Sequence, residues 1–154
     1  MARILKLHTL PHDEQILRAH NKEVIFPLDK KTLALIEDMK LTCKKAPGIG
    51  LAAPQVGVNK MIAIIHLEEF GIPTFSIINP KVASKSIKKT VMEEGCLSIP
   101  KVFGKVQRPA RVEVLAYTET GSKLRIKADK LLAKVLQHEI DHLNGVLICD
   151  KFEK

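Results

Sequence analysis

Residues 137–142 read Gln-His-Glu-Ile-Asp-His, and the rest of the chain is best understood around them. Two histidines, His138 and His142, stand four positions apart, so on an α-helix they lie on one face, one turn above each other. Two imidazoles in that arrangement can bind one metal ion, and Glu139 between them can reach a water molecule on the same ion. Such a centre lacks one ligand, and Cys96 is the candidate for it. The stretch therefore predicts a helix that carries a hydrolytic metal site.

The helix expected around this stretch is apolar on most of its circumference. Asp129 can cap its start, and Asn144-Gly145 can end it. Its apolar positions are Leu131, Leu132, Val135, Leu136, Ile140 and Leu143. Such a helix is buried, and buried histidine and glutamate side chains need polar partners. A metal ion satisfies the two histidines and its water satisfies the glutamate, which strengthens the metal prediction.

Each of these signals also has an ordinary structural interpretation. The His-Glu-x-x-His pattern arises by chance in many long helices, and most such matches bind nothing. A buried Cys96 is more often a small core residue than a ligand. Residues 48–57, a loop with three glycines and Pro54, can be a simple tight turn. The three segments together favour a metal site over these separate interpretations.

Length and composition predict one soluble domain. The 154 residues are enough for a single hydrophobic core, and we expect one catalytic domain over residues 1–154. No apolar run approaches the roughly 20 residues that cross a bilayer, and the N-terminus lacks the pattern of a signal peptide. Cys43, Cys96 and Cys149 are odd in number and widely spaced, which argues against a disulfide framework. We therefore expect a cytoplasmic protein with no membrane contact.

The formal net charge of +8 leaves two interpretations open. A basic surface can attract a polyanion such as the ribosome, or it can serve only to keep the protein soluble. Aromatic residues make up 4% of the chain and tryptophan is absent, so few side chains are available to stack on nucleic-acid bases. We predict no specific nucleic-acid partner and leave contact with the ribosome to this basic surface.

Outside the metal helix, the chain alternates between helical and extended patterns. Asp29 can cap a helix over residues 30–45, with Leu33, Ile36 and Met39 on one face. Extended segments are expected at residues 61–67, 74–78 with a stop at Asn79-Pro80, 90–97, 111–118 and 123–127, with a hairpin turn at 119–122. These elements predict an α+β fold, in which small antiparallel or mixed β-sheets pack around the central metal-binding helix and a further helix lies toward the N-terminus.

Three segments resemble, in order and spacing, the signature motifs of the peptide deformylases. They are Gly-Ile-Gly-Leu-Ala-Ala-Pro-Gln at residues 48–55, Glu-Gly-Cys-Leu-Ser at residues 94–98 and the stretch at residues 137–142. Residues 11–18 and the strand end at residues 79–80 are also similar, so the resemblance covers nearly the whole chain. It implies hydrolysis of the N-formyl group on the initiator methionine of nascent polypeptides, with release of formate.

The resemblance also implies the metal centre. Cys96, His138 and His142 would bind one divalent ion, with water in the fourth position. Fe²⁺ is the metal expected in the cell, whereas Zn²⁺, Ni²⁺ or Co²⁺ are alternatives in purified protein. A thiolate ligand donates more charge than a carboxylate, which suits iron and exposes Cys96 to oxidation.

The catalytic roles follow from the same resemblance. Glu139 would act as general base toward the metal-bound water that attacks the formyl carbon, and then as acid toward the leaving amine. The side-chain amide of Gln55 and the backbone N–H of Leu97 would stabilise the oxyanion. The peptide groove would be lined by Ile49, Gly50, Met92, Glu94 and Gly95, and the methionine pocket by Leu131, Lys134 and Val135. Lys134 is less apolar than that pocket suggests, so its stem would cover the pocket while its charge reaches water.

Two other functions are compatible with parts of the pattern. A metallopeptidase shares His-Glu-x-x-His but usually takes a histidine or glutamate as third ligand, and only Glu153 follows His142. A purely structural metal site usually has four protein ligands, and it would leave Glu139 without a role. We also expect Glu94 to form a buried pair with Arg108 that braces the strand of Cys96.

Overall fold

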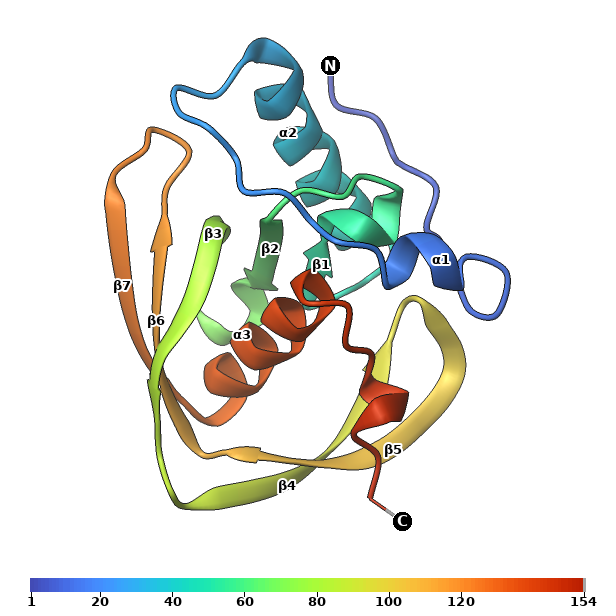
Figure 1. Ribbon diagram of the computed structural model, residues 1–154, viewed down its shortest axis with the longest axis vertical. Helices are drawn as coiled ribbons and strands as arrows, with labels where there is room; N and C mark the ends of the chain where they lie inside the picture. The colour runs from blue at the N-terminus through green and yellow to red at the C-terminus, as the bar shows by residue number, and fades with distance from the viewer. Residues whose placement is uncertain (154) are drawn as a thin grey trace.

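The computed structural model describes residues 1–153 and shows a five-stranded antiparallel sheet between two helices (Figure 1). The strand order is β1-β2-β3-β6-β7. The strands are β1 (Gly50–Ala52), β2 (Ile62–Leu67), β3 (Ile72–Lys85), β6 (Arg111–Tyr117) and β7 (Lys123–Asp129). Helix α2 (Lys30–Lys45) packs on one face and helix α3 (Lys130–Leu143) on the other. Short helices complete the chain: α1 (Glu14–Leu17), η1 (Ala53–Val56), η2 (Glu68–Phe70) and η3 (Ile148–Asp150).

Strand β2 explains why its sequence is a continuous apolar run. Side chains alternate between the two faces of a strand. Ala63, Ile65 and Leu67 point into the core that contains α3, whereas Ile62 and Ile64 point into the core that contains α2. Because helices cover both faces at this strand, an apolar residue is required at almost every position.

A separate two-stranded ribbon carries the cysteine of the site. Strands β4 (Lys89–Cys96) and β5 (Ile99–Pro109) pair antiparallel, and the ribbon curves beneath α3 (Figure 1). The register shifts between Gly95 and Cys96, where the ribbon turns. This turn places Cys96 against the face of α3.

Helix α2 begins at Lys30, as its cap predicts: the side chain of Asp29 accepts a hydrogen bond from the backbone N–H of Thr32 at 2.7 Å. Ile36 and Met39 are fully buried, whereas Leu33, which was expected on the same face, is 40% exposed. That face instead includes Thr32.

Helix α3 also has the predicted ends. It follows Asp129 and stops at Leu143, and Gly145 beyond it has φ +76°, a conformation that L side chains rarely adopt. The Asp129 side chain makes no capping hydrogen bond, however.

One expected strand end needs correction, and two strands were not expected. Strand β3 does not stop at Asn79-Pro80 but continues to Lys85, with an irregularity in its pairing between Ile78 and Lys81. The Asn79 side chain bonds both the N–H and the C=O of Val24, which supports the backbone at φ 50° there. Strand β5 and the short strand β1 were not predicted, since glycine and proline weaken their extended pattern.

No helix within residues 1–153 is long and apolar enough to cross a membrane.

Candidate active site

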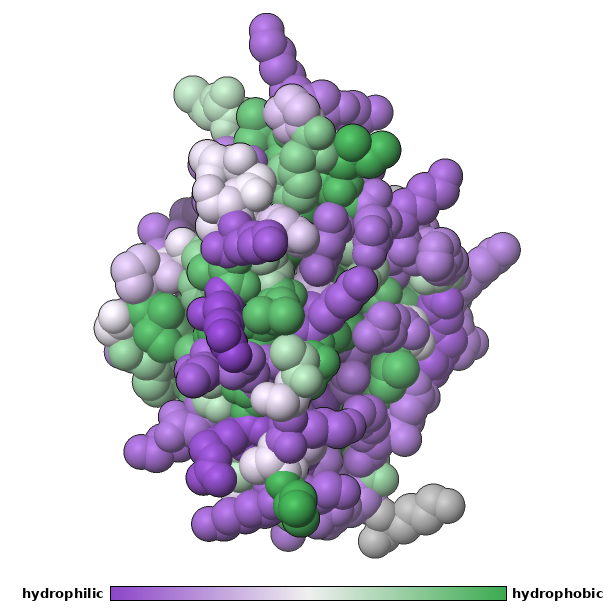
Figure 2. Space-filling view, turned by 60° about the vertical axis from the view of Figure 1, so that its left-hand side comes forward, coloured by the Kyte–Doolittle hydropathy of each residue, from purple (hydrophilic) through white to green (hydrophobic). Residues whose placement is uncertain are grey.

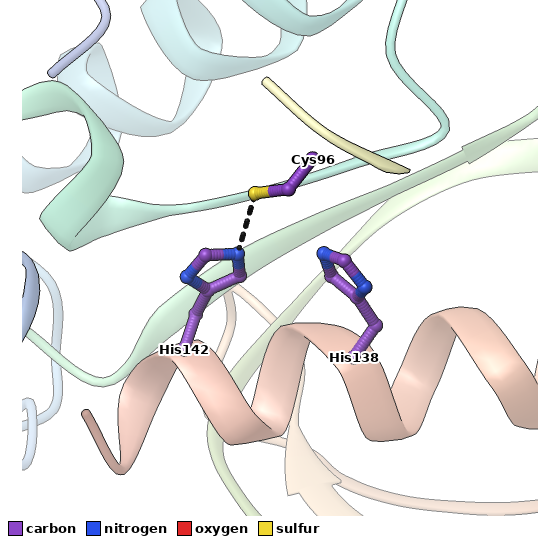
Figure 3. Close-up of side chains that lie close together, drawn as sticks. All are labelled: Cys96, His138 and His142. Carbon is purple, nitrogen blue, oxygen red and sulfur yellow. Dashed lines mark hydrogen bonds between the residues drawn. The ribbon is translucent and has the colours of Figure 1, made fainter. Parts of the chain in front are cut away.

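Three ligand atoms converge between the β4–β5 ribbon and α3. The metal-binding atoms of Cys96, His138 and His142 all lie within 4.8 Å of one another. Figure 3 shows both imidazoles rising from α3 toward the Cys96 thiol, and Cys96 Sγ lies 3.2 Å from His142 Nε2. The two imidazole centroids are 5.1 Å apart. The helix thus supplies two candidate ligands from one face, and the ribbon supplies the third.

A buried carboxylate orients the first histidine. Glu94 Oε1 lies 3.0 Å from His138 Nδ1, which leaves His138 Nε2 facing the cluster. Arg108 holds the same carboxylate through two hydrogen bonds, at 2.6 Å and 2.9 Å, and donates a third to Asp141 at 2.8 Å. The predicted Glu94–Arg108 pair is therefore confirmed, with Asp141 as an additional partner. Burial opposes ionisation of Glu94, but the bonds from His138 and Arg108 outweigh it and lower the pKa of Glu94 to about 2.

Glu139 is buried beside the cluster. Its Oε2 lies 3.9 Å from His138 Nε2, and its Oε1 has no hydrogen-bond partner within residues 1–153. Burial raises the pKa of Glu139 to about 7, against the opposing effect of the charges on His138 and Arg108. A carboxyl group with such a pKa can exchange protons at neutral pH, as a general base requires.

The close approach of β1 to Glu139 requires a glycine. A Cβ atom on Gly50 would lie 2.5 Å from Glu139 Oε2. The backbone of β1 therefore lies directly against the carboxylate, at the edge of the five-stranded sheet.

The Gln55 amide faces the cluster in a fixed orientation. Its Oε1 accepts a hydrogen bond from the backbone N–H of Ala52 at 2.9 Å. Its Nε2 therefore points the other way, 3.1 Å from Ser98 Oγ and 3.6 Å from Cys96 Sγ. Because Gln55 is 2% exposed and bonded at both ends of its amide, this N–H donor is already fixed beside Cys96, and little side-chain entropy remains to be lost when it bonds to a ligand.

A cavity of about 380 Å³ opens onto these residues. Of the residues predicted to bind substrate, Ile49, Gly50, Gly95, Lys134 and Val135 line it, together with Gln55, Leu97, Cys96, His138 and Glu139. Pro47, Gly48, Pro100, Lys101 and Phe103 complete the wall. The Lys134 ammonium donates to the Glu93 carbonyl at 2.9 Å, so this side chain bridges α3 and β4.

The other three residues predicted to bind substrate lie elsewhere. Met92 and Glu94 line a separate small hollow behind β4, and the Glu94 carboxylate points at Arg108 and His138. Leu131 packs against the core between the sheet and α3. Asp141 and Ser98 received no role from the sequence, although both lie inside the signature motifs, because their partners are distant in sequence.

The donor set fits a divalent metal ion. Glu139 Oε1 is buried beside the cluster without a partner in the described chain, so this site keeps polar capacity that protein groups do not use. Burial, and then the charges of His138 and Arg108, hold the pKa of His142 well below its ordinary value, so His142 is the neutral imidazole that binds metals. One sulfur and two nitrogen ligands leave a coordination position free, as catalytic sites do.

Such a centre, with a buried carboxylate beside it at the base of a cavity, belongs to a metal-dependent hydrolase. The family model described as polypeptide deformylase matches residues 4–154. The chain belongs to the peptide deformylase family, which removes the N-formyl group from nascent peptides.

Relatives and solved structures agree with this assignment. The chain is 46% identical over 138 residues to a peptide deformylase of Halothermothrix orenii, covering 90% of this chain and 88% of that protein. A peptide deformylase from Synechococcus elongatus in complex with actinonin matches with a TM-score of 0.90 and 45% identity, over 97% of this chain and 79% of that one. A Met-Ala-Ser-bound peptide deformylase from Acinetobacter baumannii matches with a TM-score of 0.89 and 28% identity, over 99% and 100% of the two chains. The family and the α+β fold predicted from the sequence are confirmed.

Proposed function

We propose that Cys96, His138 and His142 bind one divalent ion, that Glu139 moves the protons, and that Gln55 and Leu97 stabilise the oxyanion. The observation that carries this proposal is the convergence of the three ligand atoms within 4.8 Å, beside a buried carboxylate. When bound, the ion lowers the pKa of a water molecule and polarises the formyl carbonyl. Fe²⁺ is our choice in the cell because a thiolate and two imidazoles suit it, and Zn²⁺, Ni²⁺ or Co²⁺ can replace it in purified protein.

Glu139 performs both proton transfers. Its carboxylate takes a proton from the attacking water and then delivers it to the amine that leaves from the formyl carbon. The unpartnered Oε1 supports this role, because it is free to bond water or substrate. The backbone of Gly50 against Oε2 restricts the carboxylate on its other side.

Charge that develops on the formyl oxygen is met by two N–H groups. The Gln55 amide is turned toward the cluster by its bond from Ala52, and Leu97 follows the cysteine ligand and lines the cavity. Donors of this kind are worth about 3 kcal/mol of barrier each in comparable sites.

The substrate backbone is held by the open edge of β1. This strand pairs with β2 on one side and ends the sheet, so an extended peptide can add to it by main-chain hydrogen bonds. Such pairing does not depend on side chains, which suits an enzyme for all nascent chains. The Met-Ala-Ser peptide bound to the Acinetobacter baumannii relative supports a peptide that begins with methionine in this cavity.

We further propose that the enzyme works in the cytoplasm, on chains as they leave the ribosome, and that its net charge of +8 favours that contact. Co-sedimentation with ribosomes that is lost at high salt tests this point.

The Glu139→Gln variant tests the proposed chemistry. The amide keeps the size of the side chain but cannot take a proton, so formate release from formyl-Met-Ala-Ser should fall about 1000-fold or more, at the upper part of the usual range for a general base. The metal content should stay equal to that of the unaltered protein. Retained turnover would remove Glu139 from the mechanism, whereas loss of metal would assign it to the ligand set.

A further inference from the structure

The outer face of the sheet carries a second, unexplained surface. Residues opposite each other in β6 and β7 share a face, and Glu113, Leu115 and Tyr117 stand opposite Lys127, Arg125 and Lys123. The alternate residues Val112, Val114 and Ala116 face α3. Figure 2 brings forward the side of the molecule that carries β6 and β7, and shows hydrophilic side chains around smaller apolar patches.

Six cations gather along this surface, which we call the basic face. They are Lys81, Arg111, Lys123, Arg125 and Lys127, together with Lys85, which stands opposite Val112 but lines the same hollow as Arg111 and Lys127. All six are exposed, and they line two hollows with only Glu23, Glu113 and Asp129 as acids. Arg125 pairs with Glu113, and Lys81 lies 3.8 Å from Glu23. The other four have no carboxylate within 4.0 Å in the described chain. The face therefore keeps positive charge that its own acids do not neutralise.

The larger hollow, of about 710 Å³, combines this charge with an aromatic wall. Phe26 and Tyr117 line it with their ring centroids 5.5 Å apart, and Leu115 is 46% exposed beside them. Lys81, Lys123 and Arg125 stand around the same hollow. Tyr117 is the only tyrosine of a chain that has no tryptophan.

We infer that the basic face binds single-stranded RNA in a sequence-independent manner. Lys123, Arg125 and Lys127 occupy alternate positions of one strand, so they project from one face about 6.8 Å apart and can contact phosphates along one nucleic-acid strand. Phe26 and Tyr117 are half-buried against the core, and an unpaired base can stack on the ring surface that stays exposed in the hollow. An acidic peptide would use the cations but not the aromatic hollow. A lipid surface would use the cations and the exposed Leu115 but would offer nothing that stacks on Phe26 and Tyr117.

This inference rests on and extends the proposed ribosome contact, because it names RNA as the partner and the basic face as the surface. Composition alone does not predict such a site, since aromatic residues are scarce. The fold brings two of them into one basic hollow.

The test uses the complete, metal-loaded protein and a labelled single-stranded RNA of mixed sequence. The Lys123→Ala/Arg125→Ala/Lys127→Ala variant removes three charges from the basic face. The matched control, Lys6→Ala/Lys44→Ala/Lys105→Ala, removes three exposed charges that line neither hollow. We expect the first variant to bind the RNA about tenfold more weakly than the unaltered protein, or weaker still. The control should bind it less than about threefold more weakly. If these three cations contact phosphates, the logarithm of the binding constant should fall more steeply with the logarithm of the salt concentration for the unaltered protein than for the first variant. The two slopes should differ by about 2.

Tyr117 provides a reporter at the hollow itself. Because it is the only tyrosine, RNA bound there should quench the intrinsic fluorescence of the protein, and poly-glutamate or anionic lipid vesicles should not.

Equal weakening of RNA binding by both variants would overturn the inference, since it would show diffuse attraction to the net charge. Binding of poly-glutamate or vesicles as tight as that of RNA would overturn it as well, in favour of an acidic protein or a membrane. Formate release from a short formyl-peptide should be unchanged in both variants, which separates this inference from the catalytic proposal.

Discussion

At the scale of the residue, Glu94 determines how the metal helix meets the β4–β5 ribbon. It is 1% exposed, and its two oxygens contact Arg108 and His138. A carboxylate behind a metal-binding histidine fixes the ring and leaves its other nitrogen for the ion. The carboxylate can stay ionised in the interior because His138 and Arg108 both bond to it.

Arg108→Ala should therefore destabilise the protein strongly. The substitution leaves Glu94 buried without its arginine partner, and breaking such a pair costs about 3–5 kcal/mol. Metal affinity should fall about 10- to 100-fold, because the support behind His138 is altered. Denaturant unfolding and metal titration measure the two effects.

The control is Arg125→Ala, which breaks an exposed pair with Glu113 and should lower the free energy of unfolding by less than about 1 kcal/mol. Equal effects of the two substitutions would contradict the bracing role of Arg108.

Gly50→Ala should impair catalysis without loss of metal. The new Cβ would lie 2.5 Å from Glu139 Oε2, so the carboxylate or β1 must move. A displacement of about 1 Å in a catalytic group can cost about 100-fold in rate, and we expect a loss of kcat/KM of that order. Kinetics, metal content and Tm on one preparation check this. An active variant would show that the position of Glu139 is not restricted by Gly50.

At the scale of the element, the sequence predicted helices and buried strands well where periodicity and caps agreed. The bounds of α2 are those expected from Asp29 and from Pro47-Gly48, and Val112, Val114 and Ala116 of β6 are buried as their alternation indicated. Strand β5 was missed because it is largely exposed and includes Gly104 and two prolines. The continuation of β3 was missed because the Asn79–Val24 contact, which supports the irregular backbone, joins residues 55 apart.

The two helix caps give a matched pair of substitutions. Asp29→Ala removes a side-chain bond to the first turn of α2 and should lower Tm by a few degrees at neutral pH, whereas Asp129→Ala removes no such bond and should change it less. The bonds from Thr32 lower the pKa of Asp29, so its stabilisation is present above the ordinary value of 3.8 and is lost as the pH falls through the lowered pKa. Thermal melts of both variants at neutral and acid pH check this, and a difference that persists in strong acid would contradict it.

At the scale of the whole molecule, the site exists only because three distant segments meet. Residues 48–55, 94–98 and 137–142 contain the proposed site, and their motifs were sufficient to predict the family from the sequence alone. The support around them, from Asp141 and Ser98, depends on contacts across 33 and 43 residues of sequence. Such contacts leave no periodic signal, so only the three-dimensional arrangement reveals them.

Metal removal should weaken the contact between these three segments and expose one thiol. In the metal-loaded protein we expect only Cys149, which is exposed, to react freely. A chelator should make Cys96 reactive as well and lower Tm, because the ion stabilises the state that binds it. Burial raises the pKa of Cys43 to about 12, so this thiol should react only after unfolding. Thiol titration before chelation, after chelation and after unfolding measures this. Two rapidly reacting thiols before chelation would place Cys96 outside the metal centre.

The most direct measurement is formate release from a formyl-Met tripeptide by protein purified without oxygen, with the metal content of the same sample. We predict one metal ion per chain and a rate that rises in proportion to the fraction of chains that hold metal. A fully metallated protein that releases no formate, or full activity after complete removal of the metal, would contradict the proposed metal-dependent deformylation.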